Sequence, residues 1–340
     1  MRRFAASQCR LISLCTLGLG IGAAPIAGQT HATSFDTELF TLRSDPRVGL
    51  HHFLAVWAAA DAGEWPGYAQ PIVERDSLPQ MDADDRRTWD AAIAAYASTV
   101  GRSPVFDAGL IAVRDWAAGT AARDDVPPDD SRLVEAIERA LPVYEQHWWP
   151  AHDARNREWT RAVLPLARST ERDIARRVAA TYGGSWPEER IPVDVVAYAN
   201  DVGAYSTGGR IVTASADPAI QAEQSLEMLF HESSHTEPLE SPLRATIRDA
   251  FQQEGGTAPD RFWHDVIFFV SGDATALALE AAGRPGHRHY GETAGVYARG
   301  ERWPAQLRAF EEHLRPLVRM TDPGDAQRSA VFRAVARALM

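Results

Sequence analysis

The stretch LEMLFHESSH, residues 226–235, holds two histidines four positions apart and a glutamate directly after the first. On a helix, positions i and i+4 lie on one face about 6 Å apart at Cβ, so His231 and His235 can direct a ring nitrogen at one point. Glu232 projects about 100° round the helix from His231. This is the H-E-x-x-H pattern of two zinc ligands and a general base. The competing interpretation is the solvated His/Glu face of an ordinary helix, which the apolar residues before the motif do not favour.

The residues before the motif predict a small sheet. IPVDVVAYA (191–199) and GRIVTASA (209–216) are rich in β-branched residues and are separated by NDVGAYSTG, which predicts a β-hairpin or a short sheet. The segment VGAYSTGGRIV is either an edge strand that pairs with an extended peptide or simply a hairpin turn. Asp217-Pro218 supplies an N-cap and a first-turn proline, so we expect a helix from there through the motif, stopped by Pro238.

Helical periodicity dominates the rest of the 340 residues. Before the sheet it covers 48–62, 87–99, 131–144 and 156–182, and after the motif it covers 242–253, 260–283, 303–314 and 325–339. The order of helices, short sheet and helices predicts an α+β fold that is predominantly α. We expect residues 31–185 to form a helical N-terminal region and residues 186–340 to form the metal-binding region.

The first thirty residues have the pattern of an export signal, with arginines before an apolar stretch at 11–28 that is short and glycine-rich for a membrane span. We therefore expect a periplasmic or secreted protein with no stable membrane span after signal cleavage. Both cysteines, Cys9 and Cys15, lie in this segment. The mature chain then has no thiol, which excludes a cysteine nucleophile and thiolate–zinc sites, so any metal is held by His, Asp or Glu.

A catalytic zinc site needs a third protein ligand, and the helix expected at 260–283 offers two. His264 and Asp273 are nine residues apart, so they point to opposite sides of a helix and cannot both bind the ion. Histidine is the better intrinsic zinc ligand and is our first choice. Asp273 has the small neighbours Ser271 and Gly272, which allow close helix approach. The remaining candidates are His287 and His289 of GHRHYGE (286–292) or another acidic residue.

LEMLFHESSH, followed downstream by GDATA (272–276), resembles the gluzincin branch of the zincin metallopeptidases over about residues 190–300. The resemblance implies that His231 and His235 bind zinc and that Glu232 is the base. The chain is also similar to a family of uncharacterised exported bacterial proteins that carry this motif, a GAYT-like strand and a tryptophan–histidine helix. The matching stretches here are GAYS (203–206) and FWHD (262–265). The chain departs from gluzincins at Asp273, where they have a glutamate.

Zincins usually stabilise the oxyanion with a further donor, often a tyrosine. We expect Tyr290, in a glycine-rich loop, to have this role, although a tyrosine packed against its own loop fits the pattern too. The expected function is that of a zinc metallopeptidase acting on a peptide or protein substrate. The alternative is a non-catalytic extracytoplasmic binding module whose metal is closed in by a fourth ligand. A net charge of −11 does not favour a nucleic-acid partner.

Overall fold

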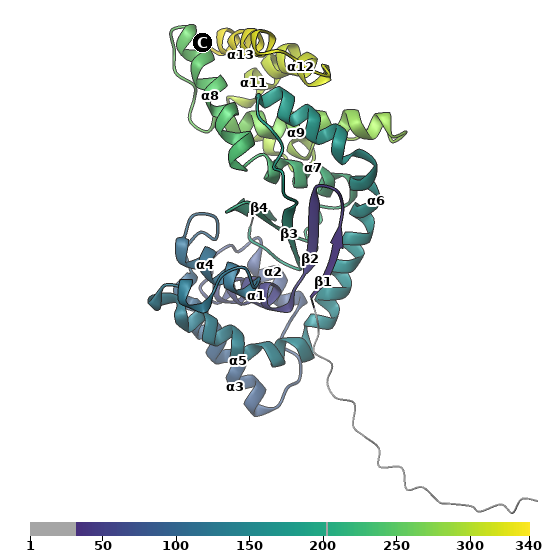
Figure 1. Ribbon diagram of the computed structural model, residues 1–340. Coiled ribbons are helices and arrows are strands. Elements are labelled where there is room, and N and C mark those ends of the chain that lie inside the picture. The colour runs from purple at the N-terminus through teal and green to yellow at the C-terminus, as the bar shows by residue number, and fades with distance from the viewer. Residues whose placement is uncertain (1–31, 202) are drawn as a thin grey trace, which may run out of the picture. The chain divides into compact units, whose positions relative to one another are not determined.

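Five short strands form a single mixed sheet in the computed structural model, which describes residues 32–201 and 203–340 (Figure 1). The strands are β1 (Thr33–Asp36), β2 (Phe40–Ser44), β3 (Ile191–Val196), β4 (Ala204–Thr207) and β5 (Arg210–Ala214). Their order is β1-β2-β3-β5-β4. The pairs β2–β3 and β3–β5 are parallel, whereas β1–β2 and β4–β5 are antiparallel. The strand β4 therefore lies at one edge.

The expected hairpin exists, but between different strands. Residues 191–199 and 209–216 contribute β3 and β5, which run parallel, and β4 lies between them in sequence. The hairpin joins β4 to β5 through Gly208 and Gly209, whose φ values are 62° and 74°. A two-residue turn with positive φ at both positions matches the twist of antiparallel strands, and glycine adopts it without strain.

The helices surround this sheet and account for most of the described chain, so the α+β fold with predominant α is confirmed. Those before β3 are α1 (Pro46–Asp61), α2 (Ala69–Arg75), α3 (Ala83–Tyr96), α4 (Ala108–Ala117), α5 (Ser131–His147) and α6 (Trp149–Tyr182). Those after β5 are α7 (Ala222–Ser233), α8 (Glu237–Gln253), α9 (Phe262–Ala281), α10 (Tyr290–Thr293), α11 (Trp303–Ala309), α12 (Arg315–Arg319) and α13 (Asp325–Leu339).

The strands β1 and β2 were not expected, because the sequence predicts a helical region over residues 31–185. The strand β2 is only five residues long, and its partner β3 lies almost 150 residues away in the sequence. No local sequence pattern therefore predicts that they pair. The sheet joins strands from both sides of the boundary expected near residue 185, and the described residues form one compact unit.

The long helix α6, which passes beside the sheet in Figure 1, contributes side chains to the two main hydrophobic clusters. One contains apolar side chains of α6, α7, α8 and α9, and the other contains those of α1, α3 and α5. Gly183, with φ 75°, ends α6 in the left-handed conformation that commonly terminates helices. Gly184 follows so close to α8 that a Cβ there would lie 2.3 Å from the carbonyl oxygen of Pro238.

Phe230 tests how strongly this core holds α7 against the sheet. Its ring is fully buried and packs edge-on against Phe40 of β2, with centroids 5.5 Å apart, and against Trp186 at 5.4 Å. We expect Phe230→Ala to lower the free energy of unfolding by about 3–5 kcal/mol. The matched control is Phe106→Ala at a side chain that is 84% exposed, for which we expect a change within about 0.5 kcal/mol. Urea unfolding curves measure both, and equal losses would contradict this packing.

The expected signal segment, residues 1–30, lies outside the described residues. Among the residues that the structure describes, no helix is long and apolar enough to span a membrane.

Candidate metal centre

The helix that carries the H-E-x-x-H motif begins later and ends earlier than the sequence predicted. It starts at Ala222 rather than at Asp217, because the Asp217 side chain accepts a hydrogen bond from the amide of Ala219 and closes a turn there instead. At the other end, the hydroxyls of Ser233 and Ser234 bond the carbonyls of the residues four positions earlier. Such bonds compete with the backbone ladder, and α7 ends at Ser233.

His235 therefore lies in the turn after α7, not on the helix itself. Its amide donates to the Glu232 carbonyl at 3.2 Å, a tighter i→i+3 turn than that of an α-helix. The two motif histidines still face each other, with ring centroids 5.4 Å apart. Pro238 does not stop the motif helix but lies in the first turn of α8, where a missing amide hydrogen costs nothing.

His264, near the start of α9, completes a group of three imidazoles. Its ring centroid lies 5.1 Å from that of His231 and 5.2 Å from that of His235. One ligand atom from each histidine lies within 4.8 Å of the others, close enough to bind a single metal ion. Within the described ranges, this group holds no fourth His, Cys, Asp or Glu side chain.

Burial lowers the pKa of two of the histidines, His231 and His264, and keeps them neutral. Burial, with the neighbouring histidines, holds the pKa of His231 well below its usual value. Burial, reinforced by His235 and by Arg261, lowers the pKa of His264 to about 3. The Nδ1 atom of His231 is buried without a hydrogen-bond partner. Neutral imidazoles with free lone pairs are what a zinc ion requires, so this donor set fits the metal.

Glu232 is next to His231 in sequence but is not one of the three residues that could bind the metal ion. Its carboxylate is buried and accepts a hydrogen bond of 2.8 Å from the hydroxyl of Ser206 on the edge strand β4. Burial raises the pKa of this carboxyl, and the nearby His235 and the Ser206 hydroxyl partly oppose the rise. A carboxylate that is more basic than usual and does not belong to the ligand group suits proton transfer.

Alternation along β4 explains how Ser206 reaches the motif. Successive side chains of a strand point to opposite faces. Tyr205 points toward α1, where its hydroxyl lies 2.8 Å from Nε2 of the buried His52. Ser206 consequently points toward α7 and Glu232. The sequence predicts a strand at Ser206 but carries no signal of its contact with the motif.

Aromatic rings pack against the group of three histidines. Phe268, one turn after His264 on α9, lies against His231 with centroids 4.1 Å apart and against His264 at 4.9 Å. Trp263 meets His235 edge-on at 5.5 Å. These rings cover part of the surface of the three imidazoles. FWHD was recognised in the sequence as a tryptophan–histidine pair, but the role of the tryptophan was not.

Asp273, the rival third ligand, does not join the group. Its Oδ1 accepts a hydrogen bond of 3.1 Å from Arg315 Nε and lies 3.4 Å from His289 Nε2. It therefore pairs with a cation on the other side of α9, as the nine-residue spacing from His264 requires. His287 lies 2.7 Å from a carboxylate oxygen of Glu227 and is likewise outside the group.

Tyr290, the expected oxyanion donor, contacts the ring of Phe268, which in turn contacts His231 and His264. Its ring stacks on Phe268 at an interplanar angle of 8°, with centroids 6.4 Å apart. Its amide donates to the buried Glu227 carboxylate at 2.8 Å, which fixes the start of α10. Burial raises the pKa of the hydroxyl to about 12, so the phenol keeps its proton at neutral pH. Its catalytic role stays a prediction.

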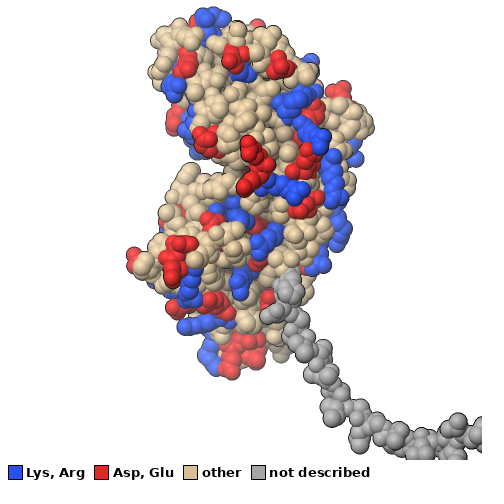
Figure 2. Space-filling view, in the orientation of Figure 1, with Lys and Arg blue, Asp and Glu red and all other residues tan. Residues whose placement is uncertain are grey.

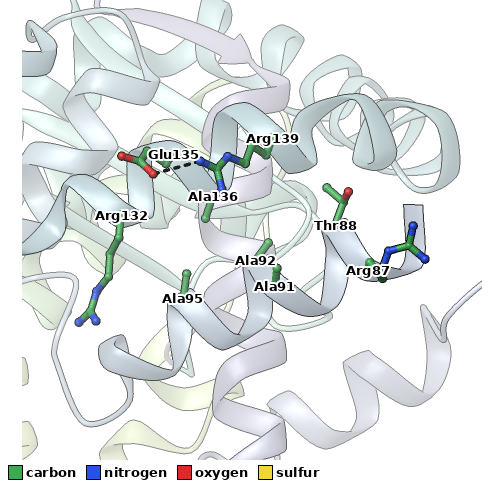
Figure 3. A pocket seen from close by; sticks show the side chains of 9 residues that line it. All are labelled: Arg87, Thr88, Ala91, Ala92, Ala95, Arg132, Glu135, Ala136 and Arg139. Atoms are coloured by element: carbon green, nitrogen blue, oxygen red, sulfur yellow. Dashed lines mark hydrogen bonds and ion pairs between the residues drawn. The ribbon is translucent and has the colours of Figure 1, made fainter. Parts of the chain in front are cut away.

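Two pockets open at the surface, one between α3 and α5 and one beside Trp263. The larger, of about 370 Å³, lies between α3 and α5, where alanines such as Ala92 and Ala136 leave space and arginines line the rim (Figure 3). None of its lining residues belongs to the histidine group. The smaller, of about 300 Å³, is lined by Arg244 of α8 and by Trp263, the residue next to His264.

No family model, no curated protein and no solved structure matches this chain.

Proposed function

We propose that this chain is an exported zinc-dependent hydrolase that cleaves peptide bonds, with His231, His235 and His264 as the zinc ligands. The observation that carries the proposal is the convergence of one nitrogen from each histidine within 4.8 Å, with Glu232 alongside. Three histidines and an open fourth position are characteristic of catalytic zinc sites. Export rests on the pattern of the first thirty residues.

A bound zinc ion would polarise the substrate carbonyl and lower the pKa of a bound water to about 7. Glu232 accepts the proton of the attacking water and later delivers it to the leaving amine. The Ser206 hydroxyl holds the Glu232 carboxylate in place for this transfer at 2.8 Å. The rings of Phe268 and Trp263 pack against the histidines and reduce their contact with water, which strengthens the electrostatic interactions within the site.

The edge strand supports a peptide as the substrate. Because β4 is the last strand of the sheet, one side of its backbone has no neighbouring strand. The surface is hollowed at the level of β4 on the face shown in Figure 2. An extended peptide can add to such an edge by backbone hydrogen bonds. Ser206 belongs to this strand, so a peptide paired there would pass the Glu232 carboxylate.

The alternative, a non-catalytic metal-stabilised binding module, needs a fourth protein ligand that closes the coordination shell. The group contains three histidines and, among the described residues, no further ligand side chain. This composition supports the hydrolase over the module.

Metal removal tests the proposal. We expect the purified chain to contain one zinc ion, to cleave members of a quenched fluorescent peptide library, to lose this activity on dialysis against a chelator and to regain it on addition of Zn²⁺. Elemental analysis and fluorescence measure the two quantities. Zinc without turnover on any peptide would favour the binding module, and absence of bound metal would remove both functions.

A further inference from the structure

Glu240 joins one of the three histidines to an arginine. It lies in the first turn of α8, and its Oε2 is 2.9 Å from Nδ1 of His235. Its Oε1 pairs with Nε of Arg244 at 2.7 Å, one helical turn later. The Glu240 side chain is 19% exposed and that of His235 is 18% exposed, so the bond between them is partly shielded from water. This carboxylate is therefore held at both oxygens.

Arg244 carries the connection on to the start of α9. Its guanidinium lies 3.8 Å from the ring centroid of Trp263, a close cation–π contact. The Trp263 ring in turn meets His235 edge-on, with centroids 5.5 Å apart. His235, Glu240, Arg244 and Trp263 thus form a closed cycle of contacts, which we call the His235 clamp. It ties the turn after α7 to α8 and to the residue that precedes His264.

The carboxylate selects the tautomer of the imidazole. An ionised carboxylate only accepts hydrogen bonds, so the Nδ1 atom of His235 must carry the ring proton. The lone pair then lies on Nε2, the atom left to bind a metal. A carboxylate behind a ligating histidine also fixes the orientation of the ring and raises its basicity. His235 has a particular need for this support because it lies in a turn beyond the last residue of α7.

We propose that Glu240 is the positioning residue of the metal centre, holding His235 with Nε2 toward the ion, and that Arg244 and Trp263 hold Glu240 in place. This inference rests on the proposed metal site. Neither His231 nor His264 has a carboxylate partner among the described hydrogen bonds and ion pairs, so the clamp acts on one ligand of the three.

Metal affinity tests the proposal separately from catalysis. Zn²⁺ affinity is measured by competition with a chromophoric chelator, and the absorption spectrum of bound Co²⁺ reports ligand geometry. We expect Glu240→Ala to weaken Zn²⁺ binding about 10- to 100-fold and to change the Co²⁺ spectrum. Glu240→Gln should lose less, because the amide oxygen can still accept from Nδ1.

The matched control is Glu254→Ala at the end of α8. That carboxylate is 12% exposed and pairs with Arg333 and Arg337, and none of its ion pairs among the described residues involves a histidine. We expect this variant to lose some stability and to keep the wild-type affinity and spectrum. Equal Zn²⁺ affinity of Glu240→Ala and the wild-type chain would overturn the inference while leaving the metal site intact. A wild-type chain that binds no Zn²⁺ would instead refute the proposed function.

Discussion

A Glu232→Gln variant is expected to keep one zinc ion per chain and to lose about 10²- to 10⁴-fold of the turnover of the wild-type chain. Glutamine has nearly the same shape and can still accept the hydrogen bond from Ser206, so the site should keep its geometry. It cannot accept a proton, however, and the attacking water then has no base. Elemental analysis measures the metal, and initial rates on the best peptide of the library measure turnover.

The matched control for this variant is Glu223→Gln, the same substitution in the first turn of α7. The Glu223 carboxylate pairs with Arg284 at 3.0 Å and lies 3.6 Å from His287, and within the described residues it does not belong to the group of histidines that could hold a metal. We expect wild-type metal content and turnover from it. Full activity in Glu232→Gln would remove the proposed mechanism, and loss of metal from that variant would show that Glu232 acts on the site in another way.

The motif alone was enough to predict two of the three histidines in the group that could bind a metal. The i, i+4 spacing brings His231 and His235 together even though α7 ends between them, because the turn that follows is tighter but continues in the same direction. The premature end of α7 has a local signal in the Ser233–Ser234 pair, because a serine hydroxyl can bond the carbonyl four residues earlier in place of the backbone. Both serines are fully buried, and the Ser234 hydroxyl also accepts from Tyr182 of α6.

The rest of the site depends on contacts between distant segments. Spacing on α9 could show that His264 and Asp273 point to opposite sides, but only the packing of α9 against α7 decides which side faces the motif. Glu240 follows His235 by five residues, a spacing that does not place two side chains on the same face of a helix. The two side chains meet because α8 begins directly after Thr236, which places Glu240 in its first turn beside His235.

The second large effect is expected from the two candidates for the third ligand. His264→Ala removes one of three nitrogen donors, so Zn²⁺ affinity should fall more than the roughly 100-fold that loss of an outer hydrogen-bond partner costs. Asp273→Ala should keep the affinity of the wild-type chain. It should instead lower the free energy of unfolding by about 1–3 kcal/mol, because Arg315 and the largely buried His289 lose their shared partner.

Measuring both quantities in both variants separates a ligand from a structural ion pair. Chelator competition gives the Zn²⁺ affinity, and urea unfolding of the metal-free chains gives the stability without the contribution of bound metal. Loss of affinity in Asp273→Ala alone would move the third ligand to the far side of α9 and restore the gluzincin-like arrangement. Loss in neither variant would eliminate both candidates. Loss in His264→Ala alone is the result that a site built from three neutral imidazoles requires, and such a site leaves the full double charge of the ion to activate water.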